Sequence, residues 1–235
     1  MSGIIDFHSH ILPGVDDGSR SLEESIAMLK SESDQGIERV VATPHFYARY
    51  DEPEEYLPRR IRAIRALREE MTNHAGLPKL AVGAEVHFFP GISHSDLLPH
   101  LTIAGKKCIL IEMPGSPWTE SMYRELENIF LKQDLLPIVA HVDRYISRFR
   151  TYGIPEHLGD LPVLVQANAS FFLNRSTRGM ALKMLECDQI QLLGSDCHNL
   201  TTRKPNLGEA VEVIRQKLGQ KALDRICGYQ KEALK

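Results

Sequence analysis

Histidine and carboxylate side chains recur directly after short apolar runs in this chain. The segment "IIDFHSHILPGVDDG", residues 4–18, places His8 and His10 one residue apart after the first run, and Asp17 follows in a turn-like loop. Imidazole and carboxylate ligands without thiolate are typical of hydrolytic sites for manganese, iron, zinc or magnesium, rather than of closed structural zinc sites. The segment therefore indicates a metal centre.

The same arrangement follows later apolar runs. The further candidates are His45 of "TPH", Glu85 of "GAE", Glu112 of "LIE", His141 of "VAH", and Asp196 and His198 of "GSDCH". Nine candidates are too many for one ion. Two or three divalent ions that share a bridging carboxylate would use them, and could activate a water for attack on a phosphate ester.

Each candidate also has an ordinary structural interpretation when taken alone. A histidine near a strand end is more often a hydrogen-bonded structural residue than a ligand, and Asp17 lies in "DDGS", a good turn sequence in which Asp16 could serve equally well. Joint placement at strand ends is what distinguishes the set. The other five histidines lie outside this pattern, and we interpret them as surface or loop residues: His74, His87, His94, His100 and His157.

The elements that must position these residues alternate along the chain. Seven short, mostly apolar runs predict strands that are covered on both faces, at residues 4–7, 39–42, 80–84, 108–111, 136–140, 163–166 and 190–193. Ser21 and Glu24 form a capping box before a helical pattern that Gly36 can close. Helical spacing also covers residues 61–71, and Thr119 can cap a helix before the fifth run.

Strands that alternate with helices predict a parallel α/β fold. A closed barrel of seven strands is the preferred topology, and an open doubly wound sheet is the alternative. In a parallel barrel the carboxyl ends of the strands meet on one face, so residues distant in sequence would converge there. A length of 235 residues with 43% hydrophobic content fits a single domain over residues 1–235.

Composition narrows the possible partners and location. The net charge of -3 gives no reason to expect nucleic acid as a partner, and no apolar run approaches the roughly 20 residues of a membrane-spanning helix. No signal segment is evident, and the four cysteines form no CxxC pair. We expect a cytoplasmic protein without membrane insertion; the oligomeric state stays open.

Four segments resemble a known superfamily. "DFHSHILPGVDDG", "ATPHF", "PIVAHVDRY" and "LLGSDCHN" are similar to motifs of the polymerase and histidinol phosphatase (PHP) superfamily of metal-dependent enzymes. Within it, the H-x-H-x-L-P-x-x-D-D-G opening and the A-H-x-x-R-Y segment resemble bacterial protein-tyrosine phosphatases of capsule and exopolysaccharide synthesis. The resemblance runs from residue 4 to about residue 208, and the motifs keep the family's order.

This resemblance implies a fold and a metal centre. The fold would be a distorted (β/α)7 TIM-like barrel, and the centre would hold two or three divalent ions, usually manganese. One ion would be surrounded by His8, His10, Glu85 and Asp196, a second by Glu85, Glu112 and His141, and the third by Asp17, His45 and His198. The activity would be hydrolysis of phosphotyrosine on an autophosphorylating tyrosine kinase by metal-activated water.

Two arginines match phosphate-contacting positions of the family. Arg144 of "HVDRY" and Arg203 of "HNLTTRKP" each offer a permanently charged fork of donors that suits phosphate oxygens. Without the resemblance, both would be interpreted as surface arginines. The chain departs from the family at the rim of the site, where Ala84 and His87 replace a glutamine and an arginine.

Other interpretations remain possible from the sequence. Residues 197–203, "CHNLTTR", satisfy the C-x5-R spacing of cysteine-dependent phosphatases, but this loop has no glycine to permit close wrapping of a phosphate. We interpret that match as coincidental. A small-molecule phosphatase, such as one acting on histidinol phosphate, would share the metal set. A non-catalytic metal-binding regulatory module is the third possibility.

Overall fold

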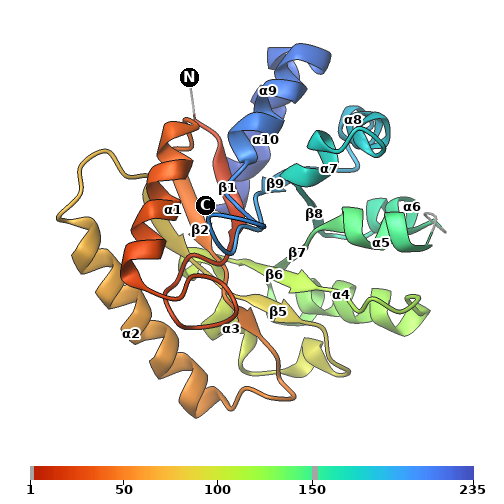
Figure 1. The fold of residues 1–235 in the computed structure, drawn as a ribbon. Helices are drawn as coiled ribbons and strands as arrows, with labels where there is room; N and C mark the ends of the chain where they lie inside the picture. The colour runs from red at the N-terminus through yellow and green to blue at the C-terminus, as the bar shows by residue number, and fades with distance from the viewer. Residues whose placement is uncertain (1–2, 150–152) are drawn as a thin grey trace.

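The architecture is a parallel sheet that curls on itself, with helices around the outside (Figure 1). A computed structural model describes residues 3–149 and 153–235, without the side chains of residues 147–149. Among the described residues, no helix combines the length and apolar character that a membrane-spanning segment needs.

The strands follow the predicted order. They are β1 (Ile5–Ser9), β2 (Arg39–Ala42), β3 (His45–Phe46), β4 (Lys79–Val82), β5 (Glu85–His87), β6 (Cys108–Glu112), β7 (Leu136–Val139), β8 (Leu164–Asn168) and β9 (Leu192–Gly194). All of their ladder pairings are parallel, in the orders β1-β2-β4 and β3-β5-β6-β7-β8-β9. An isolated parallel bridge between Ser9 and Cys197 joins β1 to the segment after β9.

Each of the seven predicted strands is present, with ends shifted by at most two residues. The sequence did not predict β3 and β5, which are too short to give a pattern and follow Pro44 and Gly83 closely. β2 and β4 belong with β1 to one strand order, whereas β3 and β5 belong to the other, so the sheet pairing breaks between β2 and β3 and between β4 and β5. The result is a mixed α/β fold with a curled parallel sheet.

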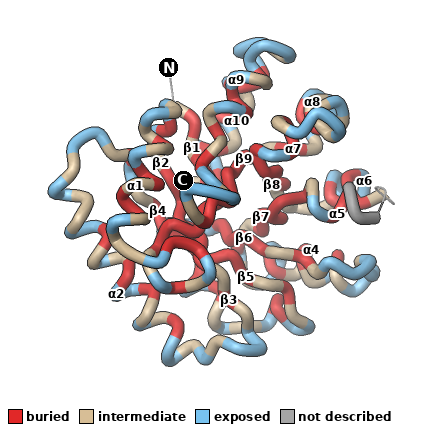
Figure 2. Tube along the Cα trace, viewed as in Figure 1, coloured by how far each residue is buried: buried red, intermediate tan, exposed pale blue. Residues whose placement is uncertain are grey.

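Helices connect the strands and cover their outer faces, and buried residues concentrate on the strands and on the inner sides of the helices (Figure 2). They are α1 (Leu22–Asp34), α2 (Pro53–Met71), α3 (Leu98–Leu101), α4 (Glu120–Gln133), α5 (Val142–Phe149), α6 (Ile154–Gly159), α7 (Ala169–Leu173), α8 (Arg178–Glu186), α9 (Leu207–Leu218) and α10 (Gln220–Ala233). Two short 3₁₀ helices are η1 (Ile92–His94) and η2 (Ile103–Gly105).

Local sequence signals explain the ends of α1. Ser21 accepts a hydrogen bond from the Glu24 N–H at 3.3 Å, and Gly36 has a φ of 78°, which favours glycine just beyond a helix. Thr119 precedes α4 as predicted, but its side chain makes no capping bond and instead lies 2.8 Å from the Ser121 hydroxyl. The N-terminus of α4 therefore lacks the predicted cap.

Two groups of buried residues hold the elements together. The larger packs the helices onto the sheet. The smaller gathers strand residues from around the curl, including Phe7, Val41, Leu110, Ile138 and Leu192, with Ala233 of α10 beside them. Burial of these side chains fixes the relative positions of the strands, and with them the carboxyl ends that carry the polar residues.

Candidate metal centre

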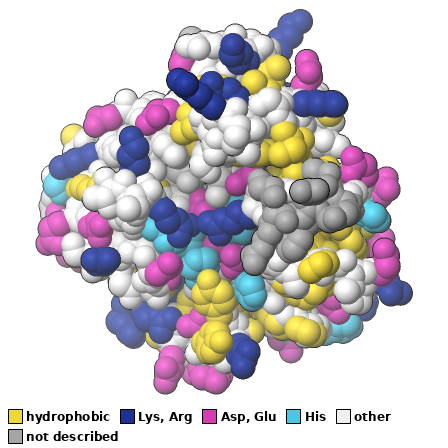
Figure 3. All heavy atoms as spheres, turned by 45° about the vertical axis from the view of Figure 1, so that its right-hand side comes forward, with side chains coloured by type: hydrophobic (Ala, Val, Ile, Leu, Met, Phe, Trp, Pro, Cys, Tyr) yellow, Lys and Arg dark blue, Asp and Glu magenta, His cyan; other side chains and the backbone are white. Residues whose placement is uncertain are grey.

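The nine predicted ligand candidates meet at the carboxyl ends of the strands. Acidic, histidine and basic side chains gather in the middle of the face shown in Figure 3, beside a group of hydrophobic side chains. Candidate ligand atoms lie within 4.8 Å of one another in three overlapping groups. These are His10, Asp17, His45 and His198; His8, His10 and Glu85; and His45, Glu85 and Glu112.

Glu85 lies at the centre of these groups and is fully buried. Its Oε1 is 2.8 Å from Nε2 of His141. Its Oε2 is 3.1 Å from Nε2 of His8, 3.3 Å from Nε2 of His10 and 3.0 Å from Nδ1 of His45. One carboxylate therefore faces imidazoles from three different strand ends, as a bridging ligand would.

Asp196 connects the histidines to the two arginines. Its Oδ1 lies 3.6 Å from Nε2 of His8 and 3.4 Å from Nε2 of His10. Nη2 of Arg203 donates to the same oxygen at 2.7 Å, and Nη2 of Arg144 donates to Oδ2. Both predicted arginines thus lie at the edge of the cluster, each partly exposed to solvent.

Asp16 and Asp17 occupy different positions. The side chain of Asp16 is only 5% exposed, and its Oδ2 accepts hydrogen bonds from Nδ1 of His10 at 2.7 Å and from the His45 backbone N–H at 2.9 Å. Asp17 is 68% exposed, and its Oδ1 lies 3.4 Å from Nε2 of His198. The geometry makes Asp16 the carboxylate that orients His10 and leaves Asp17 facing the open side of the cluster.

Sequence reasoning missed the polar residues of β8. The Gln166 Oε1 accepts from the His141 backbone N–H at 2.6 Å and lies 3.2 Å from Nδ1 of His8. Asn168 donates from Nδ2 to Oδ2 of Asp196 at 2.9 Å. A signal was available, because "VQAN" ends this strand with amides where the other strands offer ligand types.

Asp6 ties the ends of β1 and β9 together. Its Oδ1 accepts from the backbone N–H groups of His8 at 3.0 Å and Ser195 at 2.9 Å. Gly194 permits this approach, because a Cβ there would lie 2.5 Å from the Cβ of His8. Close packing of the two strand ends brings His8 beside Asp196.

The backbone is strained at two candidate ligands. His141 has a φ of 31° and Asp196 a φ of 54°, in the left-handed region that non-glycine residues seldom adopt. Such conformations persist where surrounding contacts enforce them, and they cluster at functional sites. Each is the second residue after a buried strand, and the turn of the backbone points its side chain into the cluster.

The electrostatics of the cluster favour bound positive charge. Burial alone would raise the pKa of Glu85, but His8 and hydrogen bonds from neighbouring imidazoles lower it well below its usual range. Burial alone would lower the pKa of His141, yet hydrogen bonds to Glu112 and Glu85 raise it to about 9. The carboxylates are thus ionised, and they stabilise positive charge between them.

The donor set fits divalent cations. Nδ1 of His45, Oε2 of Glu85 and Nε2 of His198 are buried, and although polar atoms lie close to each, none of the three makes a hydrogen bond of good geometry within the described residues. Buried polar atoms are otherwise almost always paired. All three belong to the overlapping groups, so cations held there would satisfy them.

The surroundings of Cys197 do not suit a nucleophilic thiol. Its side chain is fully buried, and burial together with Glu32 and Asp6 raises the pKa of the thiol well above its ordinary value. Its Sγ lies 4.0 Å from Oε1 of Glu32, on the side of α1. The C-x5-R spacing is therefore not accompanied by a thiolate facing the cluster.

His87 lies at the rim of the site. Its Nδ1 is 3.0 Å from Oε2 of Glu112, so the interpretation of this residue as a bland loop histidine was wrong. Beside it is a hollow of about 410 Å³ whose lining includes Tyr47, Tyr50 and Phe89. The ring of Tyr47 has its centroid 5.0 Å from that of His45, which connects the hollow to the cluster.

Known proteins resemble this chain along nearly its whole length. Tyrosine-protein phosphatase CpsB of Streptococcus pneumoniae is 28% identical over 228 residues, covering 93% of this chain and 92% of the relative. Tyrosine-protein phosphatase YwqE of Bacillus subtilis is 28% identical over 232 residues, covering 92% and 85%.

A solved structure has the same fold. It comes from crystal structures of YwqE from Bacillus subtilis and CpsB from Streptococcus pneumoniae, described as unique metal-dependent tyrosine phosphatases. The TM-score is 0.81 at 24% identity, over 93% of this chain and 89% of the other. Residues 4–234 match the family described as capsular polysaccharide synthesis, CpsB/CapC. The chain therefore belongs to the CpsB/CapC family.

Proposed function

We propose that this protein is a metal-dependent protein-tyrosine phosphatase. The observation that carries the proposal is the convergence of four imidazoles on the Glu85 carboxylate, with Arg144 and Arg203 at the edge of the cluster. The relatives named tyrosine-protein phosphatase support it, as does the similar fold of a metal-dependent one.

We assign the ligands in three sets. His8, His10, Glu85 and Asp196 would hold one ion; Glu85, Glu112 and His141 a second; and Asp17, His45 and His198 a third. Manganese suits these oxygen and imidazole donors, which iron, zinc and magnesium also accept. When bound, divalent ions supply Lewis acidity that activates water and neutralises charge on phosphoryl oxygens.

The chain's own residues then bind and orient the phosphate. Arg144 and Arg203 present guanidinium groups toward the cluster from opposite oxygens of Asp196, and both keep enough exposure to meet a ligand. Asp16 holds His10 in one orientation through the bond to Nδ1, which leaves Nε2 directed at the cluster. Gln166 fixes the backbone of His141 in the same way.

The aromatic hollow favours a tyrosyl substrate over a small polar one. Tyr47, Tyr50 and Phe89 give it an apolar lining directly beside His87 and Glu112. A phenyl ring whose phosphate reached the arginines would pack against such side chains. We infer that the phosphoprotein is an autophosphorylating tyrosine kinase of capsule or exopolysaccharide synthesis, in line with the family's description. ATP-dependent phosphorylation would place both proteins in the cytoplasm.

We also infer a distorted barrel of seven strand positions, formed by residues 1–235 as one phosphatase domain. Support comes from the pairs β2 with β3 and β4 with β5, each of which continues one position across a two-residue break. The bridge between Ser9 and Cys197 brings the first and last strands together.

Metal analysis combined with turnover tests the proposal. Purified protein should contain manganese or a similar divalent ion and hydrolyse both p-nitrophenyl phosphate and a phosphotyrosyl peptide, with a higher kcat/KM for the peptide than for histidinol phosphate. Preference for histidinol phosphate would favour a small-molecule phosphatase. Absence of phosphatase activity in metal-loaded protein would favour a regulatory module.

A further inference from the structure

A cavity lined by cations lies at the end of the sheet opposite the metal centre. Its lining includes Arg39 and Lys79, the first residues of β2 and β4, together with Arg60 and Arg68 of α2 and His100. The strands are parallel, so their first residues and the candidate ligands lie at opposite ends. We call this the basic cavity. Its volume is about 530 Å³, and no aspartate or glutamate is among its lining residues.

Arg60 is the unusual member of this set. Its side chain is buried, with only 9% of the residue exposed, and Nη2 donates to the carbonyl of His100 at 3.1 Å. Nε and Nη1 are buried and have no hydrogen-bond acceptor in residues 3–149 or 153–235. The Tyr56 hydroxyl interacts with Arg60 but stays neutral, because burial raises its pKa, so it offers Arg60 a polar neighbour and no anion. A buried guanidinium is normally paired with an anion.

The surrounding cations are also without acidic partners. Arg39, Arg68 and Lys79 form no ion pair with any carboxylate that the structure describes. This local excess of positive charge contrasts with the net charge of -3 for the whole chain. An anion in the basic cavity would provide acceptors for Arg60 and offset the mutual repulsion of its neighbours.

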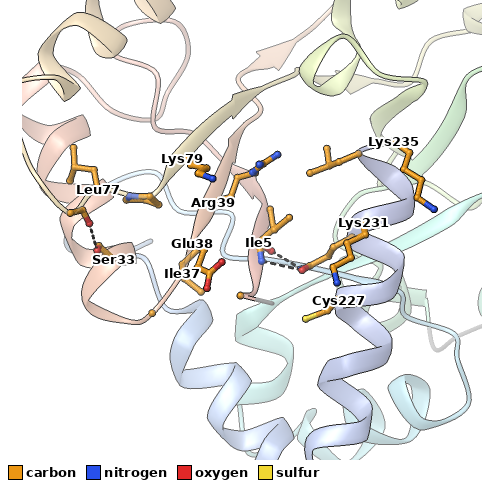
Figure 4. Close-up of a pocket in the computed structure, with 16 residues that line it drawn as sticks. Ile5, Ser33, Ile37, Glu38, Arg39, Leu77, Lys79, Cys227, Lys231 and Lys235 are labelled. Atoms are coloured by element: carbon orange, nitrogen blue, oxygen red, sulfur yellow. Dashed lines mark hydrogen bonds between the residues drawn. The ribbon is translucent and has the colours of Figure 1, made fainter. Parts of the chain in front are cut away.

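A second hollow adjoins the basic cavity and gives room for an organic group. It has a volume of about 970 Å³ and shares Arg39 and Lys79 with the basic cavity. Figure 4 shows these two side chains from adjacent strands, with Lys231 of α10 and Lys235 just beyond this helix across the hollow. Its lining also includes the apolar residues Ile5, Leu77, Pro78 and Leu234 and one acidic residue, Glu38.

We propose that the basic cavity binds a phosphate-bearing small molecule, with Arg60 as the buried anchor and the organic part in the adjoining hollow. Guanidinium forks match the oxygens of a phosphate group, and the volume lies in the range of small-molecule sites. The site is separate from the metal centre and does not depend on the function proposed for it.

Counting bound phosphate tests the proposal directly. Equilibrium dialysis of the purified protein, with its metals, against labelled inorganic phosphate should show one more site in the wild type than in Arg60→Met. Arg65→Met is the matched control, because Arg65 is an exposed arginine of α2 that does not line the basic cavity. The quantity to measure is the difference of one phosphate site between the wild type and Arg60→Met, because phosphate bound at the metal centre is counted equally in both. Equal site numbers and affinities in the two variants would overturn the proposal.

Two further measurements guard against misfolding of the Arg60 variant. The double variant of the exposed residues, Arg68→Gln with Lys79→Gln, should weaken phosphate binding at this site at least about tenfold, a smaller loss than for two buried contacts because solvent screens exposed charges. Turnover of p-nitrophenyl phosphate should be unchanged in both variants. An unchanged affinity in the double variant would equally overturn the proposal.

A competing ligand distinguishes free phosphate from an organic phosphate. Phenylphosphonate carries the same type of anion on an apolar group and cannot be hydrolysed as an ester. Displacement of labelled phosphate from the Arg60-dependent site at lower concentrations of phenylphosphonate than of unlabelled phosphate supports an organic ligand. The reverse order would overturn the role given to the adjoining hollow.

Discussion

Nε2 of His141 lies 2.8 Å from Oε1 of Glu85, although 56 residues separate them in the chain. This contact joins the ends of two strands that are not neighbours in the sheet, because β6 lies between β5 and β7. Both side chains extend across the end of β6 to meet. The centre is therefore formed by the tertiary fold. Glu85 is the residue whose carboxylate contacts imidazoles from several strand ends.

Replacement of Glu85 by glutamine should disable the centre more than it disturbs the fold. Glutamine keeps the shape but loses the charge that faces four imidazoles, so bound metal should fall and kcat/KM should drop at least about a hundredfold, the loss expected from two or more charged contacts. Metal analysis and p-nitrophenyl phosphate kinetics check this. Glu69→Gln, on the exposed side of α2, is the control, and a Glu85→Gln enzyme that kept most of its activity would remove Glu85 from the centre.

The two arginines should act on phosphate rather than on metal. Arg144→Ala and Arg203→Ala each remove a charged donor, which is worth about 1.5 to 3 kcal/mol, so kcat/KM should fall about 10- to 150-fold while metal content stays constant. Steady-state kinetics with a phosphotyrosyl peptide measure this. The exposed Arg175→Ala serves as control. Wild-type kinetics in both variants would make Arg144 and Arg203 ordinary surface residues.

The sequence predicted the strands and the gathering of histidine and carboxylate side chains at their ends. It predicted the individual contacts between these side chains less well. Apolar runs ending in histidine or carboxylate are local patterns, so the seven strands and the convergence of His8, Glu85 and His141 could be anticipated. The different positions of Asp16 and Asp17 could not, because adjacent residues of one turn differ only in which way the folded loop points them.

Residues that support the cluster from long range were the least predictable. Gln166 contacts His141 across 25 residues and His8 across 158, and no spacing rule connects such positions. The buried Nε and Nη1 of Arg60, which have no hydrogen-bond partner among the described residues, were equally hidden, since the helical pattern of α2 gives no information on the partners of a buried arginine.

Loss of the Asp16 carboxylate should weaken metal binding through His10. Asp16→Asn keeps the size of the side chain but removes the charge that fixes Nδ1 of His10, and loss of such an orienting partner typically costs 10- to 100-fold in metal affinity or activity. Manganese titration checks this, with Asp34→Asn on the exposed side of α1 as control. The melting temperature of metal-free protein should change little. Unchanged manganese affinity would contradict the orienting role.

A buried carboxyl pair beneath the centre should make stability depend on pH. Asp6 and Glu32 are both buried with carboxylate oxygens within 4.8 Å of each other, and burial together with the Asp6 charge raises the pKa of Glu32 well above its ordinary value. A raised pKa in the folded state means that its stabilising contribution is complete below the unfolded pKa of about 4.5 and is lost as pH rises.

Glu32→Gln should remove this dependence, because the amide cannot ionise. The melting temperature of the variant, relative to that of the wild type, should rise between pH 5 and pH 8. Any effect of pH on metal binding is common to both proteins and cancels in this difference. Thermal unfolding across that range measures the difference. If the melting temperatures of the two proteins changed with pH by the same amount, Glu32 would not be the group whose ionisation lowers stability.

The final prediction separates two mechanisms that could act on the same phosphotyrosine. If Cys197 were the nucleophile, Cys197→Ser would abolish turnover, chelation would have little effect, and a phosphocysteine could be trapped. Because Cys197 is fully buried beside Glu32 with a raised pKa, we expect the opposite: Cys197→Ser stays active, chelation stops turnover, and added manganese restores it. Direct attack of water should also invert the configuration at phosphorus, whereas passage through a phosphocysteine would retain it. Retention, or an inactive Cys197→Ser enzyme with its metals intact, would overturn the metal mechanism.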